Sequence, residues 1–186
     1  MKRIFDIILS LFLIILLSIP MLIIALWIKL SSKGSVIFWT DRVGINNAIF
    51  KMAKFRTMKV GTPQVATHLM KNPDQHLIPC GKFLRKYSLD ELPQLFNVLK
   101  GDMSFVGPRP ALFNQDDLVA MRTEKGISAL VPGVTGWAQV NGRDELPIPV
   151  KVSFDEYYLK NRSFLFDLRI IFLTALKVIK REGVSH

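Results

Sequence analysis

The chain has 186 residues, of which 49% are hydrophobic and 22% are charged, and its formal net charge is +10. This much apolar side chain excludes a mainly disordered protein, and this much charge excludes a protein made chiefly of membrane-spanning helices. The positive charge favours an anionic partner, and most of it lies in residues 31–110, where twelve Lys and Arg outnumber five Asp and Glu.

The first predicted element is a membrane segment, because 22 consecutive residues between Asp6 and Lys29 carry no charge. As one helix they would be about 33 Å long, enough to cross a bilayer core of about 30 Å. Pro20 lies within this helix and removes a backbone hydrogen bond, and the Ser18 hydroxyl can satisfy the freed group. Basic residues flank both ends, so charge sets no orientation. A kinked spanning helix and a re-entrant helix that breaks at Pro20 therefore both stay open.

Residues 34–58 predict two short strands joined by a Gly-Ile-Asn-Asn turn. Basic residues are frequent in the second strand, and strand alternation would place Lys54 and Arg56 on one face. Two interpretations follow. The basic residues form either a solvated edge that discourages strand pairing or a pair of cations that binds phosphate.

Residues 61–80 contain three prolines and no sustained periodicity, which predicts a long loop of the kind that is often functional. The loop ends at Cys80, and this single cysteine excludes an intramolecular disulfide. The three histidines lack carboxylate or cysteine companions at zinc-like spacing, so no zinc site is expected. No glycine-rich phosphate loop of the Walker or dinucleotide type occurs.

Residues 82–101 predict a short basic turn followed by a helix. The Ser88-x-x-Glu91 spacing has the form of a capping box. Pro93 argues against that register, because it would then lie beyond the first turn. If Asp90 is the N-cap, Pro93 falls at the third helical position, where no backbone donor is needed.

The adjacent acids Asp90 and Glu91 are the main candidates for chemistry. The structural alternative is a helix cap, which contributes about 1 kcal/mol. The neighbouring cations favour a functional role, since Arg85 precedes the pair and Arg109 follows it in a Gly-Pro-Arg-Pro turn. An aspartate among cations is expected to have a lowered pKa and to stay ionised. It can then bind a divalent metal ion or attack an electrophile whose oxygens the cations hold.

Residues 131–149 are rich in glycine and proline, which predicts tight turns or a close approach of the backbone to a ligand. Arg143 in this stretch can bind an anion or stack on a base, or it is an ordinary surface arginine. Residues 150–161 and 163–181 predict helices. The second is apolar on most faces but too short and too charged to span a bilayer, so it suits either the membrane interface or the protein core.

Several of these stretches form an ordered series of motifs: the proline-broken N-terminal segment, KFRTM, SLDELPQLFNVLKGDMSFVGPRP, PGVTGWAQVNGR, DEYY and the final apolar-basic helix. Together they resemble the small monotopic phosphoglycosyl transferases, which are bacterial sugar transferases of the bacillosaminyl-phosphate transferase type. The resemblance covers nearly the whole chain, and the central block is its most specific part. One departure is Ile19, which separates Ser18 from Pro20 where relatives have adjacent Ser-Pro.

The resemblance implies a reaction. Members of this family move a sugar 1-phosphate from a nucleotide sugar, commonly a UDP-sugar, to a polyprenyl phosphate such as undecaprenyl phosphate. They release UMP, require Mg²⁺ and start the synthesis of surface or glycoprotein glycans. The resemblance also implies a monotopic protein on the cytoplasmic face of the bacterial inner membrane, whose N-terminal helix is re-entrant.

The resemblance also implies roles for individual residues. Asp90 matches the nucleophile, which forms a phosphosugar ester in a ping-pong reaction, and it matches the position that contacts Mg²⁺. Glu91 matches its acidic partner. Five basic residues match cations near the phosphates or the nucleotide, with Arg143 nearest the nucleotide and Arg56 inferred from the same motif as its neighbour: Lys54, Arg56, Arg85, Arg109 and Arg143.

The fold expected from these elements is helix-rich α+β. Residues 1–30 form a re-entrant membrane helix, and residues 31–186 form a small catalytic domain at the cytosolic face, with a short β-hairpin and amphipathic interfacial helices. The expected partners are a UDP-sugar, undecaprenyl phosphate and membrane phospholipid. Nucleic acid is not expected, because lipid and diphosphate explain the basic charge equally well.

An alternative function is a catalytically inactive scaffold that binds nucleotide sugars or anionic lipid at the membrane. The intact acids and arginines argue against it, because a degenerate copy would be expected to lose at least one of them. The sugar itself is not identified by these motifs. An N-acetylated amino sugar, with or without a 6-deoxy group, is the favoured guess, and residues 61–80 and 111–130 are expected to shape its pocket.

Overall fold

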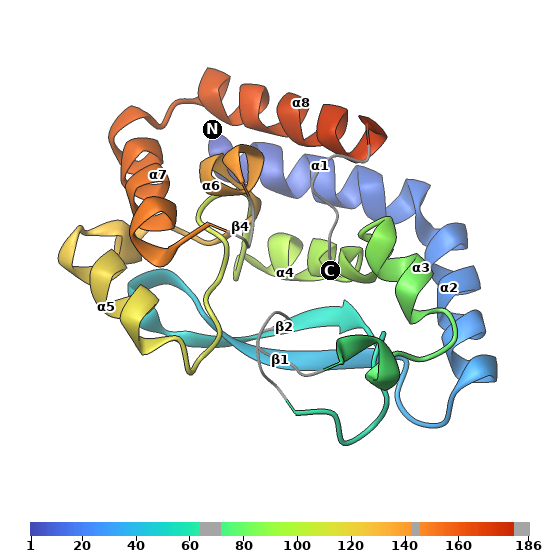
Figure 1. The fold of residues 1–186 in the computed structure, drawn as a ribbon. Coiled ribbons are helices and arrows are strands. Elements are labelled where there is room, and N and C mark those ends of the chain that lie inside the picture. Colours follow the sequence, from blue (N-terminus) through green and yellow to red (C-terminus); the bar gives the residue numbers. More distant parts are fainter. Residues whose placement is uncertain (64–71, 143–145, 181–186) are drawn as a thin grey trace.

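The computed structural model describes residues 1–63, 72–142 and 146–180. The α-helices are α1 (Lys2–Leu16), α2 (Ser18–Ser31), α3 (Gly81–Lys86), α4 (Gln94–Lys100), α5 (Asp116–Glu124), α6 (Trp137–Asn141), α7 (Ile148–Asn161) and α8 (Phe164–Lys180). The strands are β1 (Ile37–Val43), β2 (Ile49–Phe55), β3 (Ser104–Val106) and β4 (Gly133–Thr135). Short 3₁₀ turns are η1 (Ile45–Asn47), η3 (Pro73–His76), η4 (Leu89–Glu91) and η5 (Ile127–Ala129). The prediction of a helix-rich α+β protein is confirmed (Figure 1).

The predicted hairpin is confirmed, since β1 and β2 pair antiparallel with Thr40 opposite Met52. Its turn contains two asparagines with positive φ, Asn46 at 51° and Asn47 at 61°. Asparagine tolerates this left-handed conformation better than most residues, so the Gly-Ile-Asn-Asn sequence can reverse the chain here. The hairpin carries Lys54 near the end of β2.

The second sheet is parallel and contains β3 and β4. Two glycines of the stretch 131–149 lie against the backbone of Gly107, which follows β3. A Cβ atom at Gly133 would lie 2.1 Å from the Gly107 nitrogen, and one at Gly136 would lie 2.1 Å from its carbonyl oxygen. The two glycines therefore allow a close approach of the backbone to Gly107 and not to a ligand. This packing fixes the start of the Gly-Pro-Arg-Pro turn.

The N-terminal helices share the hydrophobic core of the rest of the molecule. The main core cluster contains Val98 and Val106, and Leu13 of α1 packs against it. A second cluster brings Ile28 of α2 together with Leu84 of α3. In Figure 1, α1 accordingly runs between α8 and α4, and α2 lies beside α3.

The predicted break in the N-terminal segment is present, but it lies at Leu17 and not at Pro20. Pro20 has no N–H for the carbonyl of Leu16, so the first helix ends there and the proline itself sits in the first turn of α2. The Ser18 hydroxyl donates to the carbonyl of Ile15 at 2.8 Å, and not to the carbonyl of Leu16 that faces the proline. Within the described residues, no single helix is long and apolar enough to span a bilayer, and α1 and α2 qualify only as a pair bent by 61°.

Candidate active site

The acid pair lies in a 3₁₀ turn and not at the start of a helix. Asp90 and Glu91 belong to η4, and α4 begins only at Gln94. Ser88, which has a positive φ of 54°, turns the chain into η4 and makes no side-chain cap. Both capping predictions, one with Ser88 and one with Asp90, are therefore wrong. Neither carboxylate therefore caps a helix. Asp90 is nevertheless buried, with only 8% of its surface exposed.

Lys54 bridges the two acids. Its Nζ atom is 2.7 Å from Oε1 of Glu91 and 3.8 Å from Oδ2 of Asp90. Arg109 approaches the same Oε1 atom of Glu91 from another direction, with its Nη2 atom at 3.3 Å. One carboxylate oxygen of Glu91 thus accepts from both cations, while Asp90 has the longer contact. Residues from β2, η4 and the Gly-Pro-Arg-Pro turn meet at this point.

Arg85 of α3 contributes a third positive charge. Its Nε atom donates to Oγ1 of Thr57 at 3.0 Å, which fixes the side chain beside the end of β2. Burial lowers the pKa of Arg85, and the charge of Asp90 opposes that shift. The Arg85 guanidinium in turn favours the ionised form of Asp90. Of the predicted cations, Lys54 and Arg109 therefore contact the acid pair, and Arg85 acts on Asp90 through its charge.

The two carboxylates differ in their electrostatics. Burial is the largest influence on Asp90 and raises its pKa, Lys54 opposes this shift, and the charge of Glu91 adds to it. Burial also acts to raise the pKa of Glu91. There the charges and hydrogen bonds of Lys54 and Arg109 together outweigh burial and hold the pKa well below its usual range. The expected lowering of the Asp90 pKa is wrong, because Glu91 takes the shorter contacts with the cations.

Of the remaining two predicted cations, Arg56 does not contact the acid pair. Arg56 is 6% exposed, and its guanidinium donates to the carbonyl oxygens of Lys33 at 2.6 Å and Ser32 at 3.2 Å. It therefore binds the C-terminal end of α2. Arg143 lies outside the described residues, so its predicted place near the nucleotide stays a prediction.

A metal site made by the protein alone is absent from the described residues, where no three His, Cys, Asp or Glu side chains gather. Mg²⁺ is commonly held by one or two carboxylates together with substrate phosphates and water, so one acid can be sufficient. Asp90 fits this requirement better than Glu91. Its carboxylate is buried with little compensation, whereas Glu91 is already bound to Lys54 and Arg109.

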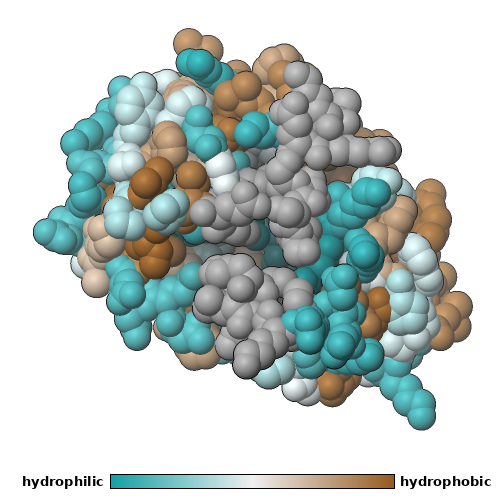
Figure 2. All heavy atoms as spheres, in the orientation of Figure 1, coloured by the Kyte–Doolittle hydropathy of each residue, from teal (hydrophilic) through white to brown (hydrophobic). Residues whose placement is uncertain are grey.

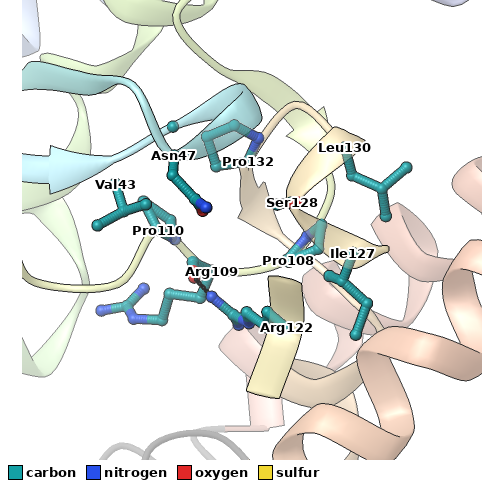
Figure 3. Close-up of a pocket in the computed structure, with 11 residues that line it drawn as sticks. Val43, Asn47, Pro108, Arg109, Pro110, Arg122, Ile127, Ser128, Leu130 and Pro132 are labelled. Atoms are coloured by element: carbon teal, nitrogen blue, oxygen red, sulfur yellow. Dashed lines mark hydrogen bonds between the residues drawn. The ribbon is translucent and has the colours of Figure 1, made fainter. Parts of the chain in front are cut away.

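A cavity lies behind the Gly-Pro-Arg-Pro turn, next to the hairpin turn, and holds about 30 Å³ (Figure 3). That volume suits one or two water molecules and is far below the volume of roughly 300 Å³ or more that a small-molecule pocket has. In Figure 3 the side chain of Arg109 extends away from Arg122 and out of this cavity. The cavity is therefore not the place where a nucleotide sugar would bind.

Asn97 is a positioning residue that the sequence interpretation missed. Its Nδ2 atom donates to the carbonyl of Lys51 at 2.8 Å, and its Oδ1 atom accepts from the N–H of Ala53 at 3.0 Å. These bonds fasten β2 to α4 and so hold Lys54 beside η4. The available signal was a single amide residue in the otherwise apolar run Leu95–Leu99, where a buried polar side chain requires a specific partner.

Comparison with known proteins gives the same family over nearly the whole chain. The family model "Bacterial sugar transferase" matches residues 1–181. EpsL of Bacillus subtilis (strain 168), named as an uncharacterized sugar transferase, is 40% identical over 189 residues, which cover 100% of this chain and 91% of EpsL.

Two further relatives carry more specific names. UDP-glucose:undecaprenyl-phosphate glucose-1-phosphate transferase of Escherichia coli (strain K12) is 42% identical over 185 residues, or 95% of this chain and 40% of that protein. UDP-N-acetylgalactosamine-undecaprenyl-phosphate N-acetylgalactosaminephosphotransferase of Aeromonas hydrophila is 39% identical over 189 residues, or 98% of this chain and 44% of that protein. The chain therefore spans less than half the length of these two relatives.

Proposed function

This chain belongs to the bacterial sugar transferase family, and on that premise we propose that it transfers a sugar 1-phosphate from a UDP-sugar to undecaprenyl phosphate and releases UMP. The observation that carries the proposal is the pair of buried Asp90 and partly buried Glu91 beside Lys54, Arg85 and Arg109. Two adjacent carboxylates among several cations suit a reaction in which a negatively charged diphosphate meets an acidic nucleophile. The names of the E. coli and A. hydrophila relatives describe this transfer.

The proposed reaction has two displacements at one phosphorus atom. A carboxylate oxygen of Asp90 attacks the sugar-bearing phosphorus, and the bond from that phosphorus to the oxygen of the leaving UMP breaks. A phosphate oxygen of undecaprenyl phosphate then attacks the same phosphorus and displaces the Asp90 carboxylate, which yields undecaprenyl diphosphate sugar. Arg85 and Arg109 would hold the phosphate oxygens, and ionised Glu91 would keep Lys54 and Arg109 in place.

We assign Mg²⁺ binding to Asp90. When bound, the ion would supply positive charge against the diphosphate oxygens. It would also favour the ionised form of Asp90, whose burial otherwise raises its pKa. Glu91 is not assigned to the ion, because its carboxylate is occupied by Lys54 and Arg109.

We further propose that the pair α1–α2 enters the membrane and returns to the same side. At one end, Lys2 donates to Asp167 at 2.6 Å and Arg3 donates to the carbonyl of Val98 at 2.6 Å. At the other end, Arg56 binds the carbonyl groups that follow α2. Both ends are thus bound to the same domain, which supports a re-entrant rather than a spanning segment.

The exposed surface of these helices supports membrane contact. Several large apolar side chains of α1 and α2 are more than half exposed: Ile4, Ile8, Phe12, Ile15, Ile19, Leu22 and Leu30. Figure 2 shows apolar atoms along the right-hand edge, where Figure 1 places α2. An apolar surface of this kind favours contact with lipid. Because the reaction uses a nucleotide sugar, we place the domain on the cytoplasmic face of the inner membrane.

The test of the proposed function is UMP release in detergent with Mg²⁺ and undecaprenyl phosphate. The donors are the UDP forms of glucose, galactose, their N-acetylated amino sugars and a 6-deoxy amino sugar, since relatives of similar identity are named for different sugars. We expect release with at least one donor and a loss of about 10³-fold or more in Asp90→Asn. The matched control is Asp117→Asn on the exposed face of α5, which should keep full activity.

A second measurement tests the intermediate. Incubated with the active donor but without acceptor, the wild-type protein should gain the mass of one sugar phosphate, and Asp90→Asn should not. Full activity in Asp90→Asn would remove Asp90 from the reaction. Absence of UMP release from the wild type with every donor would favour the inactive scaffold.

A further inference from the structure

Asp155 of the DEYY motif forms a buried ion pair with Arg122, and the proposed reaction at Asp90 and Glu91 assigns no role to this pair. Asp155 of α7 is 1% exposed and Arg122 of α5 is 8% exposed. The Nε and Nη2 atoms of Arg122 donate to Oδ2 of Asp155 at 3.0 Å and 2.6 Å. The desolvation of two buried charges offsets much of their attraction, so such a pair adds little net stability on average. A role other than stabilising the fold is therefore expected for this pair.

Arg122 makes a third bond, to the backbone of the Gly-Pro-Arg-Pro turn. Its Nη1 atom donates to the carbonyl oxygen of Arg109 at 2.8 Å, and a dashed line marks this bond in Figure 3. The planar guanidinium thus binds Asp155 with one edge and the turn with another. Lysine has a single nitrogen and cannot reproduce this arrangement.

The residue held in this way, Arg109, also contacts the acid pair. The side chain of Arg109 leaves the turn away from Arg122 (Figure 3), and its Nη2 atom lies 3.3 Å from Oε1 of Glu91. The next part of the turn is held from the hairpin, because the N–H of Val43 donates to the carbonyl of Ala111 at 3.0 Å. A shift of the Arg109 carbonyl would therefore move its guanidinium relative to Glu91.

We propose that Arg122 and Asp155 are positioning residues that set the Arg109 guanidinium at the acid pair. Asp155 orients Arg122, Arg122 holds the main chain of Arg109, and the side chain of Arg109 meets Glu91 and the substrate phosphates. The expected effect of these two residues on activity rests on the proposed function. Its structural part, the fixing of the turn, stands on the hydrogen bonds alone.

The first test compares Arg122→Lys with Lys125→Met in the UMP-release assay. Lys125 pairs with Glu156, so it also joins α5 to α7, but the pair is more exposed and does not touch the turn. We expect kcat/KM to fall about 10- to 100-fold in Arg122→Lys, because a displacement of about 1 Å can cost this much, and to stay within about twofold in Lys125→Met. Unchanged kcat/KM in folded Arg122→Lys would overturn the proposal.

A double variant separates positioning from folding. Arg122→Met combined with Asp155→Leu removes both buried charges and keeps apolar side chains of similar volume in their place. Such replacements are often neutral or stabilising, so the melting temperature should stay near that of the wild type. Activity should remain as low as in Arg122→Lys, because the bond to Arg109 is still missing. Recovery of wild-type activity would mean that the pair only supports the fold.

A double-mutant cycle tests whether Arg122 acts through Arg109. In an Arg109→Ala background the guanidinium to be positioned is gone, so Arg122→Lys should change kcat/KM by less than about threefold. If the losses of kcat/KM caused by the two substitutions instead multiply in full, Arg122 acts on the site by another route and the proposal fails.

Hydrogen exchange decides the structural part independently of the reaction. Backbone amides in residues 107–113 should exchange faster in Arg122→Lys than in the wild type, and at the wild-type rate in Lys125→Met. Unaltered exchange in Arg122→Lys overturns the positioning role even if no donor supports UMP release. Absence of UMP release from the wild type, with faster exchange in Arg122→Lys, contradicts the proposed function alone.

Discussion

At the scale of single residues, two neighbouring acids have opposite properties. Asp90 has its pKa raised chiefly by burial, and Glu91 has its pKa lowered because Lys54 and Arg109 bind it directly. Glu91 is therefore the permanent anion that orders the cations. Asp90 is the carboxylate whose charge is least compensated by the protein, which suits a group that must react with phosphorus or bind a metal ion.

This difference predicts a pH effect. A raised pKa means that Asp90 stays protonated to a higher pH than an ordinary aspartate, so the rate of adduct formation should rise with pH until it passes this pKa. Glu91→Gln removes a neighbouring negative charge and frees Lys54 to pair with Asp90. The pKa of Asp90 should fall, and the acid limb of the rate profile should move to lower pH.

The measurement is the rate of phosphosugar adduct formation at constant Mg²⁺ across the acid limb, with each variant scaled to its own plateau. Scaling is needed because Glu91→Gln is also expected to lower the plateau by disordering Arg109. If the acid limb of the Glu91→Gln profile stays in place or moves to higher pH, the assignment of this ionisation to Asp90 is contradicted.

Arg56 gives a prediction that separates a structural from a substrate-binding role. Its guanidinium binds the carbonyls of Ser32 and Lys33 and is almost fully buried, and a hydrogen bond to a charged group contributes about 1.5 to 3 kcal/mol. Arg56→Met should therefore lower the melting temperature by about 5 °C or more, whereas Lys59→Met, an exposed control nearby, should not. A normal melting temperature together with a raised KM for the donor would instead indicate a phosphate ligand.

Arg56 also shows why part of the site could not be predicted. Strand alternation placed Lys54 and Arg56 on one face, but β2 ends at Phe55, so the alternation no longer applies at residue 56. Lys54, Arg85 and Arg109 were identified through motifs. Their distances to the acids depend on the packing of three separate elements, and a local pattern contains no such information.

At the scale of elements, periodicity and turn residues predicted most of the structure. The hairpin, the short basic helix α3 and the long helices α7 and α8 lie where they were expected. The errors in the predicted elements lie at their ends, whereas the β3–β4 sheet, α5 and α6 were not predicted. Pro20 indicated a break in the N-terminal segment, but the apolar run gives no sign that the break lies at Leu17, three residues before the proline. The left-handed conformation of Ser88 replaces the expected cap with a 3₁₀ turn.

The break between α1 and α2 leads to a prediction about topology. In Pro20→Ala the new N–H can bond to the carbonyl of Leu16, which favours one straight helix over residues 2–31 about 45 Å long, sufficient to cross a bilayer. A cysteine inserted between Met1 and Lys2, in a Cys80→Ala background, should be protected from an impermeant maleimide added to the periplasmic side. Pro20→Ala should make it reactive there.

The control for that experiment is Pro63→Ala, a substitution in the loop after the hairpin, which should leave the cysteine protected. Labelling from the periplasmic side without any proline substitution would contradict the re-entrant arrangement. Continued protection in Pro20→Ala would show that the bonds of Lys2 and Arg3, and not the proline, hold the first helix in place.

At the scale of the whole molecule, the N-terminal helices and the domain are packed as one unit. The boundary predicted at residue 30 falls inside α2, and both core clusters include side chains from α1 or α2. The sequence indicated the apolar character of this segment, but not that Asp6 accepts from the N–H of Phe105 at 3.1 Å. Contacts across such separations depend on the complete fold, so composition and periodicity could not predict them.

The bonds of Lys2 also set an order of events during biosynthesis. Its partner Asp167 lies 165 residues later in the chain. At about 5 to 20 residues per second, the ribosome adds that partner roughly 8 to 30 s after it has added the lysine. Throughout this interval the first helix lacks the contacts that later cover one of its faces, so lipid or a chaperone must shield it. The first helix is therefore translated long before it can reach its final contacts.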